Sequence, residues 1–307
     1  MNTNKLSNEY QNPAVVYLDS LSNSSQRTLR QALNVIAGIL TGDADYLICE
    51  WAALRFQHTS LVQSRLANYY APATVNKMLS ALRGVLKTAW KLDLMSLEDY
   101  ARASSIKDMK NNPLPTGREL QSGEISALLK SCQDDPTPAG VRDMALLALL
   151  YSCGLRREEP VNLDLSDYDP VSGDLKILHA KLNKQRMNYL VDGAARAMDD
   201  WLNLRGDEPG PLFWPINKGG RLVNRRMTSQ AIYNILQKRK EQSGIKDCSL
   251  CDLRRTYVSH SLAAGADISI VAGLVGHSSV ATTARYDRRP EEARRKAAKL
   301  LHVPYGK

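Results

Sequence analysis

The chain has 307 residues, of which 41 are Lys or Arg and 32 are Asp or Glu, so its formal net charge is +9. Hydrophobic residues make up 43% of it, which excludes a disordered chain, and its length predicts two domains. No stretch reaches the roughly 18–20 apolar residues of a membrane span, so we expect no membrane partner. The positive charge favours nucleic acid as the partner.

The number and spacing of the cysteines indicate the redox state of the cellular compartment. The five cysteines are scattered and odd in number, which argues against a disulfide scaffold and for a reducing environment. The N-terminal sequence MNTNKLSNEYQNP lacks the apolar core of a secretory signal. We therefore expect a cytoplasmic protein that associates with the nucleoid.

The N-terminal third predicts helices. Residues 1–22 are polar and predicted to be frayed, a helix is predicted over 24–40, and a second could start near residue 43 and continue to about 54. A third helix, from about residue 73 to 91, has the clearest apolar period. Cations lie on its other faces, either as phosphate contacts or as a solvated surface: Lys77, Arg83, Lys87 and Lys91.

A linker follows. Residues 107–118 read KDMKNNPLPTGR, with two prolines, a glycine and no apolar period. It predicts a helical domain over residues 1–110 and a larger domain over residues 111–307.

The larger domain is predicted to be mostly helical. A nearly continuous apolar run over 141–151 indicates a buried helix. Alternating patterns predict short strands at 163–165, 175–178 and 187–191, with a turn over 169–174. Further helices are expected over 194–204, 228–243, 252–264, 268–275 and 290–301. The predicted fold class is mainly α: a helical first domain, then a mixed α/β domain with a small antiparallel sheet.

Three separated segments of the second domain carry residues suited to phosphodiester chemistry. They read GLRREE from Gly154, DLRRTY from Asp252 and GHSSVATTARY from Gly276. Two arginines can donate paired hydrogen bonds to the non-bridging oxygens of a phosphodiester, and a tyrosine can attack its phosphorus. This chemistry needs no metal and no nucleotide, so we expect no cofactor.

These segments resemble the conserved boxes of the tyrosine recombinase (phage integrase) family, and the layout is similar to its compact, Xer-like or simple integrase members. The resemblance covers roughly residues 20–300. It implies a core-DNA-binding domain followed by a catalytic domain. It also implies that Arg156 and Arg254 are the catalytic arginines, with Glu159 orienting them. His277 takes the family's His/Trp position, and Tyr286 is the implied nucleophile.

The family also carries a lysine in a β-hairpin, usually within Gly-Lys-Gly-x-x-x-Arg. The corresponding stretch here is AKLNKQR, from Ala180 to Arg186, in which neither glycine is kept. Lys181 is the better match and Lys184 the competitor. By the resemblance, Lys181 would be the general acid that protonates the leaving 5′-oxygen.

The second box departs from the family at Cys251, where histidine is usual. A thiol is a weak hydrogen-bond donor and cannot act as an imidazolium. Three interpretations are open. We favour the first, that DNA cleavage tolerates the cysteine. The others are that residue 251 is an engineered or variant position, and that the protein has lost catalysis and only binds DNA. Cys248 and Cys251 form a Cys-x-x-Cys unit without a second ligand pair for zinc, which leaves a redox pair as a hypothesis.

The resemblance implies a site-specific DNA recombinase that forms a 3′-phosphotyrosine intermediate and a Holliday junction during integration, excision or resolution. Its expected partners are double-stranded DNA with specific core sites, three further copies in a homotetramer, and accessory DNA-bending proteins. The tail helix after Tyr286 would dock on a neighbouring copy. Rival interpretations are a type IB topoisomerase, a non-catalytic DNA-binding regulator derived from an integrase, and a basic RNA-binding protein.

Overall fold

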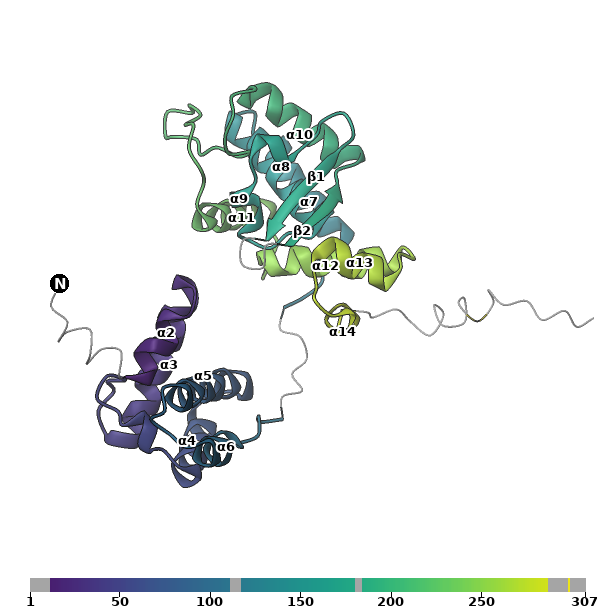
Figure 1. Ribbon diagram of the computed structural model, residues 1–307. Coiled ribbons are helices and arrows are strands. Elements are labelled where there is room, and N and C mark those ends of the chain that lie inside the picture. Colours follow the sequence, from purple (N-terminus) through teal and green to yellow (C-terminus); the bar gives the residue numbers. More distant parts are fainter. Residues whose placement is uncertain (1–11, 111–116, 180–183, 287–297, 299–307) are drawn as a thin grey trace, which may run out of the picture. The chain divides into compact units, whose positions relative to one another are not determined.

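The computed structural model describes residues 12–110, 117–179, 184–286 and 298. The chain forms two compact units, Met1–Leu114 and Pro115–Lys307, which we call unit 1 and unit 2 (Figure 1). Helices dominate, and two strands form a small antiparallel sheet, which confirms the predicted fold class. Among the described residues, no helix is both long and apolar enough to cross a membrane.

Unit 1 is helical and is organised around its longest helix, α5. Its elements are α2 (Pro13–Asp19), α3 (Asn23–Thr41), η1 (Trp51–Ala53), α4 (Phe56–Tyr69), α5 (Pro72–Lys91) and α6 (Leu97–Ser104). α5 contacts all the others, and its predicted apolar face is buried. Gly84 lies inside α5 because a Cβ there would come within 2.3 Å of the Tyr17 ring on α2. The missing side chain lets the two helices approach closely.

The prediction of a frayed start is wrong for the stretch that forms α2. The Asn12 side chain accepts a hydrogen bond from the Ala14 amide, and Pro13 opens the helix. Ala14 and Leu18 are buried against the core of unit 1. Tertiary packing stabilises this helix, which is too short to be stable alone.

The predicted helix near residues 43–54 is also wrong, since only the short turn η1 forms there. The Asp45 side chain accepts from the Leu47 amide, and the Trp51 indole donates to the Tyr46 carbonyl. These local bonds replace helical ones. Two helices, α4 and α6, were not predicted.

Unit 2 surrounds the buried helix α8. Its helices are α7 (Ser122–Gln133), α8 (Pro138–Cys153), α9 (Glu159–Asn162), α10 (Asp192–Arg205), α11 (Ser229–Ser243), α12 (Leu250–Ala263), α13 (Ile268–Val275) and α14 (Val280–Ala284). α8 packs against α7, α10 and α12. Its apolar side chains from Ala145 to Leu150 are all buried, as its continuous apolar sequence predicts.

The sheet pairs β1 (Asp174–His179) with β2 (Lys184–Tyr189), in a register that runs from Asp174 opposite Tyr189 to His179 opposite Lys184. The predicted strand at 163–165 is wrong. Asp164 makes only an isolated bridge to Pro211, and the 3-10 turn η2 (Leu165–Asp167) follows it.

The start of α12 is fixed to the start of unit 2. Ser249 and Asp252 form a capping box, and Asp252 also accepts from the Arg118 amide. The buried Thr256 hydroxyl accepts from the Leu120 amide. The helix that carries Cys251 and Arg254 is therefore held rigidly. Figure 1 shows α12 and α13 at the same end of unit 2 as β2, and α13 contacts β2.

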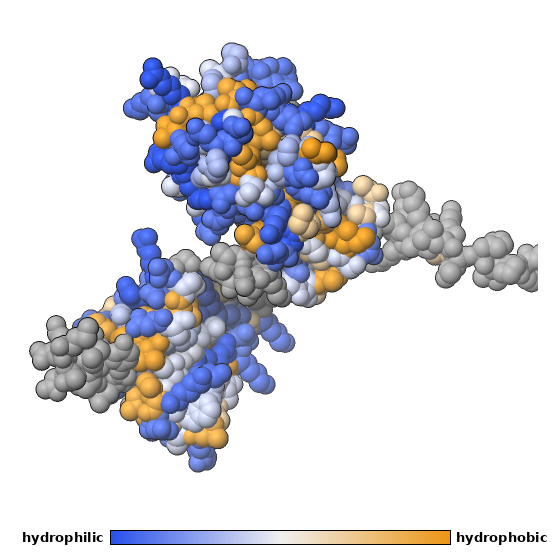
Figure 2. Space-filling view, turned by 45° about the horizontal axis from the view of Figure 1, so that its top comes forward, coloured by the Kyte–Doolittle hydropathy of each residue, from blue (hydrophilic) through white to orange (hydrophobic). Residues whose placement is uncertain are grey.

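On the face drawn in Figure 2, hydrophilic side chains cover most of each unit, with smaller apolar patches between them. A large apolar core lies in each unit, and unit 2 has a further small apolar cluster around Val258 and Val271. Each unit therefore has the burial that an independently packed body needs.

Candidate active site

Arg156 is placed by a glycine turn at the end of α8. Gly154 ends the helix with φ of 56°, and a Cβ there would come within 2.5 Å of the Tyr257 ring. This left-handed turn directs the chain into α9. The Arg156 guanidinium donates to Glu159 Oε1 at 2.9 Å and to the Gly276 carbonyl at 2.6 Å. The first and third boxes therefore meet directly.

Arg254 reaches the same place from α12. Its Nη1 donates to the Gly154 carbonyl at 2.6 Å and its Nη2 to the Val275 carbonyl at 2.7 Å. Burial first, and then the charge of Arg156, lower the pKa of Arg254 to about 10. No carboxylate among the described residues pairs with Arg254. Two cations held this close would be stabilised by a bound anion.

Glu159 fixes the orientation of Arg156. It is only 7% exposed, and its two oxygens accept from the Arg156 amide, the Arg156 side chain and the Arg186 guanidinium. Burial by itself raises the pKa of Glu159, but the hydrogen bonds and charge of Arg186, with those of Arg156, outweigh burial and lower it. Glu159 therefore stays ionised and acts as a fixed acceptor.

His277 and Tyr286 lie together after α13. Gly276 ends that helix with φ of 66°, and His277 Nδ1 lies 2.8 Å from the Thr283 hydroxyl. The Tyr286 ring stacks on the His277 ring, with centroids 6.0 Å apart and planes 17° apart. The Tyr286 amide donates to the Thr283 carbonyl at 2.9 Å. Thr283 of α14 therefore contacts both residues and fixes the positions of their rings.

Cations lie close to Tyr286. The Arg255 guanidinium carbon is 5.3 Å from the centroid of its ring. A negative charge on Tyr286 would favour the charged form of Arg254, so these two groups interact electrostatically. The predicted residues Arg156, Arg254, His277 and Tyr286 therefore belong to one constellation, linked through the end of α13.

We expect the His277 imidazole to stay neutral at physiological pH. Burial first, and then the charges of Arg254 and Arg156, lower its pKa to about 4. The unfolded chain binds this proton near pH 6.5, so it binds more protons than the folded chain between about pH 6.5 and 4. The free energy of unfolding should therefore fall as pH falls through that window.

An NMR titration of the His277 ring, assigned with the His277→Gln variant, checks this. A midpoint near pH 4 is expected, and a midpoint at or above about pH 6 would contradict it.

Comparisons with known proteins place the chain in a family. The model of the phage integrase family matches residues 118–292. This chain belongs to the phage integrase family. Tyrosine recombinase XerC of Treponema denticola is 30% identical over 247 residues, which cover 76% of this chain and 78% of the relative. Tyrosine recombinase XerD of Mycobacterium leprae is 35% identical, over 68% of this chain and 67% of its own.

Solved structures show the same fold. XerH recombinase bound to palindromic difH substrate matches with a TM-score of 0.66 at 18% identity, over 90% of this chain and 79% of that one. The Tn1549 transposon integrase in complex with a circular intermediate DNA matches with a TM-score of 0.65 at 14% identity, over 94% and 99%. The predicted membership is confirmed, and the protein is a tyrosine-type site-specific recombinase.

Two candidates were named for the family lysine, Lys181 and Lys184. Lys181 lies outside the described residues. Its competitor Lys184 is the first residue of β2. The general acid therefore stays a prediction.

Cys251 is exposed on the first turn of α12, three residues before Arg254. Its neighbour Cys248 is buried, and burial, followed by the charge of Asp252, raises the pKa of Cys248 to about 11. A thiol with so high a pKa is hardly ionised at neutral pH, which argues against the redox pair. Among the described residues, no group of three or more His, Cys, Asp or Glu could hold a metal ion.

One contributor to this recombinase site was not predicted. Arg186 on β2 binds Glu159 through both terminal nitrogens. The signal was present, because Arg186 ends the hairpin stretch that resembles Gly-Lys-Gly-x-x-x-Arg. Its ion pair joins positions 27 residues apart, and no local pattern shows that contact.

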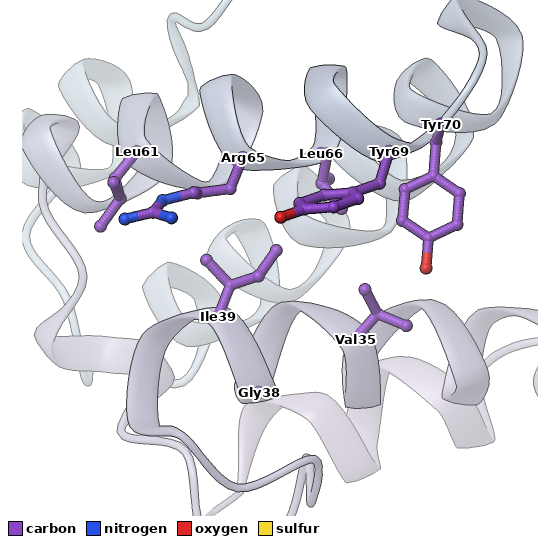
Figure 3. A pocket seen from close by; sticks show the side chains of 8 residues that line it. All are labelled: Val35, Gly38, Ile39, Leu61, Arg65, Leu66, Tyr69 and Tyr70. Atoms are coloured by element: carbon purple, nitrogen blue, oxygen red, sulfur yellow. The ribbon is translucent and has the colours of Figure 1, made fainter.

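A cavity of about 580 Å³ lies in unit 1, between α3 and α4 (Figure 3). Val35, Ile39 and Leu61 line it with the rings of Tyr69 and Tyr70. Its lining is largely apolar and includes none of the predicted catalytic residues. Gly38, Arg65 and Leu66 complete the lining.

Proposed function

We propose that this recombinase cleaves and rejoins double-stranded DNA at specific core sites through a covalent bond to Tyr286. The observation that carries the proposal is the convergence of Arg156 and Arg254 on the carbonyls that precede His277, with Tyr286 stacked on that histidine. The XerH recombinase is bound to a palindromic difH substrate and the Tn1549 integrase to a circular intermediate DNA, which supports this choice of substrate.

The residues divide the chemistry in a consistent way. Arg156 and Arg254 have donors left for the non-bridging oxygens, where negative charge grows in the transition state. The Tyr286 hydroxyl releases its proton to solvent, and its oxygen attacks phosphorus and forms a phosphotyrosine bond as the bond to the 5′-oxygen breaks. The leaving 5′-oxygen takes a proton, which we assign to Lys181. Because one ester replaces another, the strand can be rejoined by the reverse reaction.

Recombination needs two sites. We propose that a homotetramer exchanges one pair of strands, passes through a Holliday junction and then exchanges the other pair. The biological outcome would be integration, excision or resolution of a mobile element or replicon, with accessory DNA-bending proteins as further partners. The tail after Tyr286, which would dock on a neighbouring copy, lies mostly outside the described residues.

We also propose that residues 1–110 act as the core-DNA-binding domain and residues 111–307 as the catalytic domain. Cations of α5 would contact phosphates in a salt-dependent way. Arg83 is the exception, since it is already bound to Asp108 and to the Ile106 carbonyl. This leaves Lys77, Lys87 and Lys91 as the candidates on that helix.

Sequencing the DNA that remains covalently attached to the protein in cells tests the function. We expect a recurrent core sequence joined to the wild-type protein and none joined to Tyr286→Phe. Attachment without a recurrent sequence would favour a topoisomerase. No attachment in the wild type would favour a regulator that only binds DNA.

Restoring the family histidine tests the role of Cys251. The exposed thiol donates hydrogen bonds weakly, so Cys251→His should cleave a nicked suicide substrate about tenfold faster than wild type, the effect of one hydrogen bond to a charged group. Cys251→Ser is the matched control and should stay near the wild-type rate. No cleavage by wild type or by Cys251→His would contradict catalysis itself.

A further inference from the structure

The C-terminal end of α13 is capped by three arginines from three different elements. The carbonyls of the consecutive residues 274, 275 and 276 accept, in order, from Arg186 of β2, Arg254 of α12 and Arg156 before α9. Carbonyls at a helix end lack partners within the helix and carry partial negative charge. This end therefore organises three guanidinium groups directly before His277.

Arg186 is more fully enclosed than Arg156. Its side chain is 11% exposed, against 37% for that of Arg156. Its Nε donates to the Leu274 carbonyl at 2.9 Å, and its Nη1 and Nη2 donate to Glu159 at 2.9 and 2.6 Å. These bonds commit the guanidinium to the protein, so Arg186 is poorly placed to bind a phosphate itself.

Glu159 transmits the effect of Arg186. Its Oε1 accepts from Nη1 of both Arg186 and Arg156, and its Oε2 accepts from Arg186 Nη2 and the Arg156 amide. Without Arg186, each oxygen of this buried carboxylate would lose one of its two donors. The carboxylate could then rotate, and the Arg156 guanidinium would rotate with it.

A second contact joins Arg186 to the His277 turn. A Cβ on Gly276 would lie 3.2 Å from Arg186 Nη1, so the guanidinium packs directly against that glycine. Asn188, also on β2, donates to the same Leu274 carbonyl as Arg186, at 3.2 Å. β2 thus holds the end of α13 at two points.

We propose that Arg186 is a positioning residue for strand cleavage: it fixes Glu159 and the end of α13, and through them the guanidinium of Arg156. The inference rests on the proposed function, because it assumes that Arg156 binds the scissile phosphate. Lysine cannot replace Arg186, since one ammonium group cannot make the planar set of bonds to a carboxylate and a carbonyl.

The test measures single-turnover cleavage of a nicked suicide duplex that carries the core site recovered from cells. Arg186→Gln should lower the rate at saturating protein about 10- to 100-fold and change the dissociation constant for DNA less than about threefold, as misplacement of a catalytic group does. Melting curves select a temperature at which every variant is folded. Arg186→Lys should show a similar defect and takes the place of Arg186→Gln if the latter does not fold.

Two comparisons make the result specific. Because Arg186 acts through Glu159, the double variant Glu159→Gln/Arg186→Gln should cleave no more slowly than the slower single variant. Arg205→Gln removes a still more buried arginine that donates only to carbonyls of residues 206, 210 and 211, so it should lower stability without lowering the rate.

A wild-type rate for Arg186→Gln, or multiplying defects in the double variant, would overturn this inference alone. Absence of Tyr286-dependent cleavage by the wild type would instead overturn the proposed function.

Discussion

Replacing Tyr286 by phenylalanine is expected to lower covalent complex formation by at least about 10⁴-fold, because the change removes the attacking oxygen. The phenyl ring keeps the stacking on His277, the contact with Arg255 and the packing against the small apolar cluster around Val271. DNA binding should therefore stay within about threefold of wild type, since no phosphate contact is lost. Denaturing gels measure the covalent complex, and gel shifts measure binding.

Tyr233→Phe is the matched control for the nucleophile. Tyr233 lies on α11 with 40% of its surface exposed and takes no part in the site. It should form the covalent complex at the wild-type rate. Covalent complex formed by Tyr286→Phe at a rate near that of wild type would identify another nucleophile and contradict the proposed mechanism.

The second large effect concerns Arg254. Arg254→Lys should lower the cleavage rate about 10²- to 10³-fold, which is the usual cost of removing one preorganised transition-state donor. The guanidinium binds the Gly154 and Val275 carbonyls and still has donors for a phosphate. The single ammonium group of a lysine cannot bind both of these carbonyls and a phosphate. Burial, which lowers the pKa of Arg254 to about 10, would also disfavour the charge of a lysine there.

Single-turnover cleavage at saturating protein measures this effect, with circular dichroism to confirm folding. Arg205→Lys is the control, since Arg205 also donates to backbone carbonyls in unit 2 and lies outside the site. A rate for Arg254→Lys within about threefold of wild type would show that charge alone suffices at this position.

Local patterns predicted the elements whose burial follows a regular period. α5 has an apolar face and α8 a nearly continuous apolar run that can be read directly from the sequence, and they are the central helices of their units. α2 was missed because it is stabilised by packing on α5, and the stretch before η1 was misread because side chains there bond to nearby backbone. Neither the packing of α2 on α5 nor the side-chain bonds before η1 follow from the apolar period of the sequence.

The sequence by itself predicted the chemical parts of the candidate site: Arg156, Glu159, Arg254, His277 and Tyr286 can be named from their boxes, together with the departure at Cys251. Only the tertiary structure decided how they are held. The meeting of α8, α12 and β2 at the end of α13, the lowered pKa of His277 and the position of Arg186 depend on contacts between residues up to 120 positions apart. Burial and the nearby charges that shift a pKa exist only once the chain has folded, so no local pattern records them.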